Sequence, residues 1–290
     1  MKARMNGIWL AQPERGSRFA MELIAWITLN LGHAAGRVLL TPICLYFVLF
    51  SRTARSASRS YLARVLRRKA GFREVFRHYH TFAATVHDRV YLLSGRLDQF
   101  EIKVKGENAL TVALSRGRGC VLLGSHLGSF DVLRALGARK YAISVVMHET
   151  GNVNLVLKRL NSQFEPRVIP PGKPETLLQV KECLERNEIV GMLGDRTFAN
   201  GETSECNFLG SPARFPYGPF KVAAILNVPV VLFFGLYRGE QRYEVVFEPF
   251  ADRIESGSLD SFIGRYVARL EHTAREAPYN WFNFYDFWDR

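Results

Sequence analysis

The sequence has 290 residues, of which 48% are hydrophobic, and this is enough for one large hydrophobic core or two small ones. Its net charge of +12 favours an acidic partner, which composition leaves open as nucleic acid, anionic lipid or an acidic carrier protein. The four cysteines form no CxxC pair and no metal-ligand spacing, which indicates a reducing compartment without a disulfide framework.

The chain begins with a polar, basic stretch over residues 1–18 that lacks the early apolar region of a cleaved signal peptide. Residues 19–50 are strongly apolar: between Glu22 and Arg52 the only formal charge is Arg37, and Pro42 interrupts the pattern. A spanning helix needs about 20 apolar residues. One tilted span, a re-entrant hairpin, a helix lying at the membrane interface and a pair of buried core helices all fit this stretch.

Basic residues crowd positions 51–80, where Glu74 is the only acid. An apolar stripe at helical spacing accompanies them, formed by Tyr61, Leu62, Val65 and Leu66. A basic cluster directly after an apolar segment is typical of anchoring at an anionic cytoplasmic leaflet. The sequence contains no RNP, helix-turn-helix or zinc-finger pattern, so we expect a membrane partner and no nucleic acid.

Helical and strand patterns alternate from residue 79 onward. Helices are predicted over residues 79–93, 109–116, 132–138, 154–164, 174–186, 221–226 and 259–274. Strands are predicted over residues 100–105, 121–123, 142–147, 167–169, 189–193, 228–236 and 243–247, and the last two are expected to pair as a hairpin. The first helix is expected to pack on the core through Phe82, Val86, Val90 and Leu93. This order predicts an α/β fold with a mixed, partly parallel sheet flanked by helices, to which the N-terminal membrane-associated helical segment is added.

Two groups capable of proton chemistry, His126 and Asp131, lie in the turn after the strand at 121–123. Their five-residue spacing places them about 140° apart on a continuous helix, so they can meet only if the chain bends at Gly128 and Ser129. A carboxylate on one imidazole nitrogen leaves the other nitrogen free to take a proton. A packed histidine with a helix-capping aspartate fits the same residues equally well. The order Gly-Ser-His-Leu-Gly lacks the GxSxG pattern of a serine hydrolase.

A second set of polar residues follows the strand at 189–193. Asp195 and Arg196 come directly after it, and Arg214 lies in a stretch stiffened by glycines and prolines, residues 208–220, which is predicted to be a shaped loop. Guanidinium groups suit bidentate binding of phosphate, although each arginine by itself fits a surface ion pair. Together with the His126 turn, they predict a site at the carboxyl ends of the strands.

Four blocks then resemble a known group of enzymes. They are His126-Leu-Gly-Ser-Phe-Asp131, Phe208-Leu-Gly with Ala213-Arg-Phe-Pro-Tyr-Gly-Pro219, Asn227-Val-Pro-Val-Val-Leu-Phe-Phe, and Ala277-Pro-Tyr-Asn-Trp-Phe-Asn-Phe. In this order they resemble the HX4D-type bacterial late lipid A (lauroyl/myristoyl) and lysophospholipid acyltransferase superfamily, from about residue 20 to the end. The lipid A enzymes usually carry an Asp-Gln-Asp-like run at the position where this chain has Gly194-Asp-Arg-Thr. The chain therefore looks closer to a predicted acyltransferase branch than to the lipid A enzymes themselves.

The resemblance implies transfer of a fatty acyl group from an acyl-carrier-protein or acyl-CoA thioester. The acceptor would be a hydroxyl or amine of a lipid, glycolipid or lipid-like molecule. His126 would act as general base and Asp131 would orient it, while backbone amides near Gly128 would stabilise the oxyanion. The implied substrate-binding residues are Arg196, Arg214, Gly128, Ser129, Gly218 and Asp195. The implied reaction needs no metal and no cofactor beyond the thioester co-substrate.

The expected organisation is a membrane segment with a basic helix over residues 1–80 and a catalytic domain over 81–290. The expected location is the cytoplasmic face of the bacterial inner membrane, with anionic membrane lipid as a partner. Two other functions stay open: a thioester or lipid hydrolase that uses water as acceptor, and a non-catalytic lipid-binding membrane protein.

Overall fold

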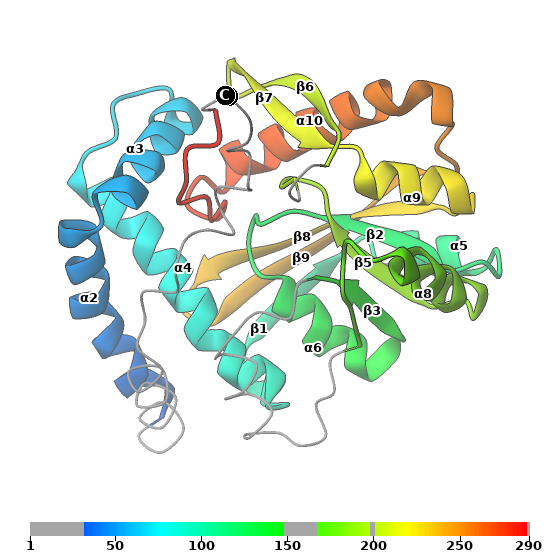
Figure 1. Cartoon of the computed structure of the whole chain (residues 1–290). Coiled ribbons are helices and arrows are strands. Elements are labelled where there is room, and N and C mark those ends of the chain that lie inside the picture. Colours follow the sequence, from blue (N-terminus) through cyan, green and yellow to red (C-terminus); the bar gives the residue numbers. More distant parts are fainter. Residues whose placement is uncertain (1–31, 148–166, 198–200, 289–290) are drawn as a thin grey trace.

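The centre of the molecule is a seven-stranded sheet in the order β1-β9-β8-β2-β5-β3-β4 (Figure 1). The computed structural model describes residues 32–147, 167–197 and 201–288. The strands are β1 Glu101–Lys105, β2 Cys120–Gly124, β3 Ile143–Val146, β4 Val168–Ile169, β5 Ile189–Leu193, β8 Val230–Gly239 and β9 Arg242–Ala251. β8 and β9 form an antiparallel hairpin, and the other neighbouring pairs of this sheet are parallel. The predicted mixed, partly parallel α/β sheet and its hairpin are therefore confirmed.

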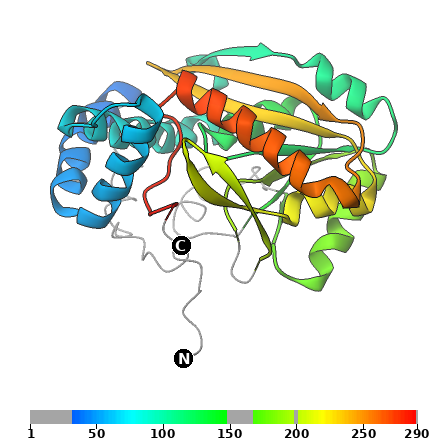
Figure 2. The same ribbon diagram turned by 90° about the horizontal axis from the view of Figure 1, so that it is seen from above.

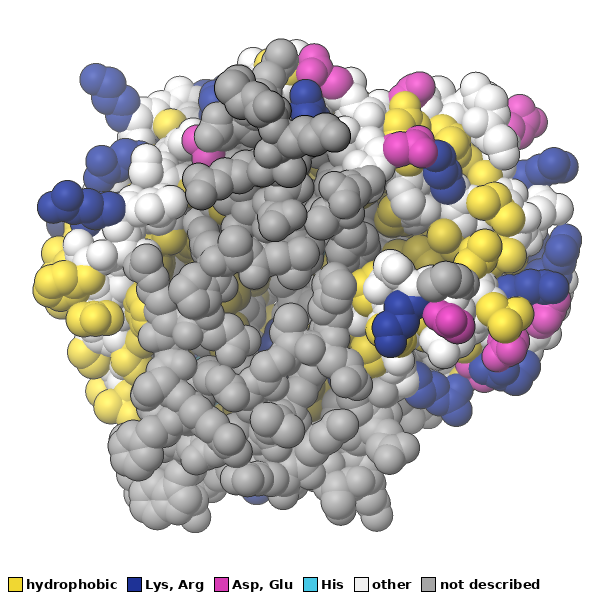
Figure 3. Space-filling model, viewed as in Figure 1, with side chains coloured by type: hydrophobic (Ala, Val, Ile, Leu, Met, Phe, Trp, Pro, Cys, Tyr) yellow, Lys and Arg dark blue, Asp and Glu magenta, His cyan; other side chains and the backbone are white. Residues whose placement is uncertain are grey.

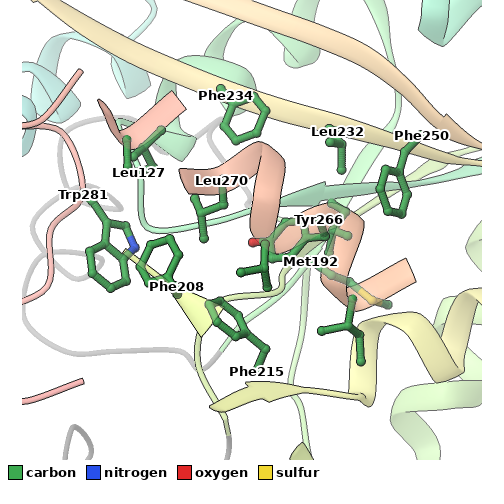
Figure 4. Close-up of a cluster of buried hydrophobic side chains, with 14 of the residues drawn as sticks. Leu127, Met192, Phe208, Phe215, Leu232, Phe234, Phe250, Tyr266, Leu270 and Trp281 are labelled. Carbon is green, nitrogen blue, oxygen red and sulfur yellow. The ribbon is translucent and has the colours of Figure 1, made fainter. Parts of the chain in front are cut away.

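Helices cover both faces of this sheet (Figure 2). They are α5 Asn108–Leu114, α6 Phe130–Lys140, α8 Pro174–Glu185, α9 Gly218–Leu226 and α10 Leu259–Glu276. Because strand side chains alternate between faces, Val121 and Leu123 of β2 pack in one cluster with α8, α9 and α10. Cys120 and Leu122 pack in the other cluster, with α5 and α6. Figure 4 shows part of the first cluster, in which Tyr266 of α10 lies beneath the sheet.

A two-stranded hairpin, β6 Thr203–Phe208 and β7 Ser211–Pro216, crosses the stretch predicted as a shaped loop. Leu209 and Gly210 connect the strands with φ angles of 53° and 82°, as a two-residue turn with both φ values positive requires. The loop prediction is wrong here because alternate side chains of β7 are buried: Ala213 and Phe215 pack in the core.

Among the described residues, three α-helices precede the sheet: α2 His33–Phe50, α3 Arg52–Leu66 and α4 Phe72–Leu93. α2 continues through Pro42, contrary to the expected interruption, since an internal proline removes one N–H donor but need not end a helix. α3 buries Tyr61, Leu62 and Val65, as its apolar stripe predicts. α4 crosses residue 80 without a break, and the domain division at that residue stays a prediction. The helix predicted at 154–164 lies outside the described residues.

The buried face of α4 agrees with the predicted one at Leu93, which is buried, and at Val90, which packs against the core, but differs from it elsewhere. Phe82 is 40% exposed, whereas His87 and Asp88 are buried. Asp88 can be buried because it is bonded on both oxygens: Arg37 donates to both at 2.8 and 2.9 Å, and Tyr243 donates to Oδ2 at 2.8 Å. His33 also lies 2.7 Å from Oδ1. Burial raises the pKa of Asp88, but its hydrogen bonds and Arg37 outweigh this and hold it at about 2.

This ion pair ties α2 to the body of the protein. Among the described helices, α2 is the one that is long and apolar enough to cross a membrane, with a mean hydropathy of 1.6 and 22% of its residues buried. Its buried residues, Gly36, Leu40, Cys44 and Val48, recur every four positions and so form one face of the helix. The opposite face carries exposed Val38, Tyr46 and Phe50. α2 thus packs along α4 on one side and presents apolar side chains on the other.

Candidate active site

The candidate site lies at the carboxyl ends of β2 and β5. These parallel strands are in register so that Gly124 faces Leu193. His126 and Asp195 each follow two residues after these partners, and therefore emerge side by side at the edge of the sheet where sites of α/β proteins form. The predicted position of the site at the strand ends agrees with this arrangement.

His126 is bonded to Asp195 through both its side chain and its backbone. The His126 ring nitrogen Nδ1 lies 2.9 Å from Asp195 Oδ1, and the His126 N–H donates to Oδ2 at 2.9 Å. Because a carboxylate only accepts, Nδ1 carries the proton and Nε2 is left as the basic nitrogen. No described residue bonds Nε2, and the side chain is 30% exposed.

The electrostatics keep His126 neutral and Asp195 charged. Burial lowers the pKa of His126, Arg196 lowers it further, and Asp195 opposes both. Burial raises the pKa of Asp195, but the attraction of His126, its hydrogen bond and the charge of Arg196 bring it down to about 2. A neutral imidazole oriented by an ionised carboxylate is the arrangement that a general base needs.

Asp131 does not orient His126, so the predicted pairing is wrong. Its carboxylate accepts from Arg89 Nε at 2.5 Å and from Arg134 at 3.1 Å. α6 begins at Phe130, so Asp131 lies in its first turn and the side chain reaches α4 and the next turn of its own helix. Burial raises the pKa of Asp131, and the two guanidinium groups lower it more.

The turn between His126 and α6 is clamped by backbone hydrogen bonds. Gly128 N–H donates to the Asn280 carbonyl and Ser129 N–H donates to the Gly235 carbonyl, both at 2.7 Å. A Cβ on Gly128 would lie 2.1 Å from the Gly235 oxygen, so only glycine fits there. Since both amides are already bonded, neither of them is free to stabilise an oxyanion, and the wider expectation for backbone amides near Gly128 stays a prediction.

The C-terminal residues 278–288 run between the N-terminal helices and the β6–β7 hairpin (Figures 1 and 2). Residues 277–284 formed one of the resembling blocks in the sequence, and in the fold this segment reaches the site. Trp281 Nε1–H donates to Asp195 Oδ2 at 2.9 Å, and Phe282 N–H donates to the His126 carbonyl at 3.0 Å. Sequence reasoning missed the contact of Trp281 with Asp195, which lies 86 residues away in the chain.

The predicted anion-binding residues lie in different places. Arg196 donates to the Phe282 carbonyl at 2.7 Å and its guanidinium lies 5.4 Å from the centre of the Tyr285 ring, next to the site. Arg214 is exposed on β7, opposite Glu205. Gly218 is the exposed first residue of α9. Among the described residues, the hydrogen bonds of His126 and Arg196 involve neither Arg214 nor Gly218, so the substrate-binding role of these two residues stays a prediction.

One described cluster has the side chains of a metal site: His33, His87 and Asp88. Their ligand atoms lie within 4.8 Å of one another. Arg37, however, already bonds both oxygens of Asp88, and its positive charge disfavours a cation at the same carboxylate. The cluster fits the ion pair that fastens α2 better than a metal centre.

Comparison with known proteins identifies the family of the chain. The family model described as bacterial lipid A biosynthesis acyltransferase matches residues 24–290, nearly the whole chain. No curated protein sequence matches the chain.

Proposed function

Because the chain belongs to the bacterial lipid A biosynthesis acyltransferase family, we propose that it transfers a fatty acyl group from a thioester to a hydroxyl or amine of a lipid-like acceptor with His126 as general base. The reaction type, acyl transfer in lipid biosynthesis, follows from the family. The observation that carries the role of His126 is its bond to Asp195, which leaves Nε2 basic and accessible.

His126 and Asp195 suffice to move the proton from the acceptor to the leaving thiolate. His126 Nε2 takes the proton of the acceptor O–H or N–H as the acceptor attacks the thioester carbonyl, and Asp195 stabilises the resulting imidazolium. The tetrahedral oxyanion then collapses, the carbon–sulfur bond breaks, and the departing thiolate takes the proton from Nε2. Acyl carrier protein and acyl-CoA both supply such a thioester. Arg196, beside the pair, is a cation suited to a phosphate of donor or acceptor.

The first test is a transfer assay with labelled acyl-acyl carrier protein or acyl-CoA and a bacterial lipid extract, read by mass spectrometry. The wild-type protein is expected to form an acylated lipid, and His126→Ala to lose at least about 10²-fold in rate because the base is gone. Release of free fatty acid whatever acceptor is offered would identify a hydrolase instead. Full transfer by His126→Ala would refute the assigned base, and transfer by neither protein would favour the lipid-binding alternative.

We further place the enzyme at the cytoplasmic face of the inner membrane, with the exposed face of α2 against the lipid. Large apolar side chains lie on this face, among them Val38 at 72% and Phe50 at 68% exposure. Figure 3 shows them along the left edge, with Lys and Arg side chains above them in the region of α3. Apolar residues beside cations suit an anionic leaflet.

The double variant Leu49→Asp/Phe50→Asp is expected to bind vesicles containing phosphatidylglycerol at least about tenfold more weakly. Two apolar side chains that contact the lipid are lost, and two negative charges are added that the anionic lipid repels. Leu178→Asp on α8 is the matched control, since Leu178 is also an exposed apolar residue, at 56%. Vesicle co-sedimentation measures both. Unchanged binding of the double variant, or an equal loss in the control, would contradict the assignment of α2.

A further inference from the structure

We infer that Trp281 is a positioning residue for the His126–Asp195 pair, and that the C-terminal segment 279–282 holds both partners in place. The inference rests on the proposed function of His126 as base. It concerns a part of the chain far from the HX4D motif in sequence.

Trp281 adds a further donor to those that His126 directs at Asp195. Asp195 Oδ1 accepts from the imidazole of His126, and Oδ2 accepts from the His126 N–H and from Trp281 Nε1–H, each at 2.9 Å. The indole thus supplies a donor that does not belong to His126 itself. The Asp195 side chain is fully buried and Trp281 is 1% exposed, so water does not substitute for a lost donor. The indole N–H therefore fixes how the carboxylate faces the imidazole.

Trp281 is itself held by the N-terminal helices. His78 Nε2 lies 2.9 Å from the Trp281 carbonyl, and Ser58 Oγ lies 2.8 Å from His78 Nδ1. Burial lowers the pKa of His78 to about 4, so the ring is neutral, donates to the carbonyl through Nε2 and accepts from Ser58. The indole also packs edge-on against Tyr61, with ring centres 5.0 Å apart. Helices α3 and α4 thus fix the tryptophan that faces the site.

The residues beside Trp281 hold the other partner. Phe282 N–H donates to the His126 carbonyl, and the Asn280 carbonyl accepts from Gly128. The Asn280 side chain is bonded in turn to β8, where its Oδ1 accepts from Tyr237 N–H at 2.7 Å. Segment 279–282 therefore bonds the backbone of the base, the carboxylate that orients it and a strand of the sheet. Figure 4 shows Trp281 beside Leu127, the residue after His126.

Loss of the indole N–H has a chemical consequence that loss of packing does not. Without it, Asp195 can rotate and its bond to Nδ1 weakens, so the proton is no longer confined to Nδ1. The base then spends less time with Nε2 unprotonated and aimed at the acceptor. Removal of the partners that orient a metal-ligating imidazole typically changes affinity or activity about 10- to 100-fold, and we expect a loss of the same order for the partner of this base.

The test compares Trp281→Phe with Trp288→Phe. Both remove an indole N–H from the same aromatic cluster, but Trp288 donates to the Phe208 carbonyl and not to the pair. Trp281→Phe is expected to lower kcat about 10- to 100-fold at unchanged KM for donor and acceptor, while Trp288→Phe keeps kcat within about twofold. A second measurement does not depend on catalysis: NMR titration of histidine-labelled protein, with the His126 signal assigned through His126→Ala. Because Asp195 raises the pKa of His126, weaker coupling is expected to lower that pKa in Trp281→Phe alone.

A wild-type kcat together with a wild-type His126 titration in Trp281→Phe would overturn the inference. So would equal losses in the two variants, which would show that the tail only stabilises the fold. If wild-type protein shows no acyl transfer but the His126 titration moves in Trp281→Phe alone, the positioning role stands and the proposed function fails.

Discussion

Asp195→Asn is expected to lower the rate of acyl transfer by about 10³- to 10⁴-fold while the protein stays folded. An amide of the same shape can still fill the buried position between His126 and Trp281, but it carries no charge. It can also present an N–H to Nδ1, which selects the tautomer with the proton on Nε2, where the base must be free. The magnitude follows the aspartate of a serine-protease triad, whose replacement by asparagine lowers kcat about 10⁴-fold for the same reason.

The pH profile separates this effect from unfolding. Since Asp195 raises the pKa of His126, its loss is expected to move the acid limb of kcat/KM to lower pH even as the plateau falls. The limb moves to lower pH because protonation of His126 removes activity, and a base with a lower pKa becomes protonated only at a lower pH. Asp98→Asn, at an exposed aspartate, is the control and is expected to match wild type. Activity of Asp195→Asn within tenfold of wild type would contradict the assignment of Asp195.

Asp131→Asn is expected to act on stability, lowering the free energy of unfolding by about 3 kcal/mol at pH 7. The substitution leaves Arg89 and Arg134 facing each other without their shared carboxylate, and the Arg134 side chain is only 9% exposed. Breaking a buried ion pair by removing one partner costs about 3–5 kcal/mol, and the partial exposure of Arg89 places this case at the lower end. Urea unfolding followed by circular dichroism measures the loss.

The pH dependence of this stability has a definite sign. The pKa of Asp131 is lower in the folded protein than in the unfolded chain, so its contribution is present above the unfolded value of about 4 and is lost as pH falls further. The difference between wild type and Asp131→Asn is therefore expected to shrink below about pH 4. Glu107→Gln is the control because it breaks an exposed pair with Lys140, which lies on α6 like Asp131, and exposed ion pairs add little to stability. An Asp131→Asn protein as stable as this control, yet inactive, would restore Asp131 to the catalytic pair.

The buried face of α4 shows one limit of periodicity. The apolar spacing of Phe82, Val86 and Val90 favours that face, yet the chain buries His87 and Asp88 instead. A polar face can be buried when distant residues satisfy it, and here Arg37, from the apolar helix α2, and Tyr243, from β9, do so. No local pattern contains that information, since the partners lie 51 and 155 residues away.

The sequence by itself determined the α/β architecture, the hairpin of β8 and β9, the basic segment after an apolar one, the family, and the strand-end turn that carries His126. These follow from local alternation and from motifs that are contiguous in the chain. Only the tertiary structure decided which carboxylate serves His126. Asp131 is nearer in sequence, but the start of α6 directs it to Arg89 and Arg134, while parallel pairing of β2 with β5 brings Asp195 beside the imidazole. Register between strands and the path of the C-terminal tail depend on the packing of the whole chain, and those two features make the site.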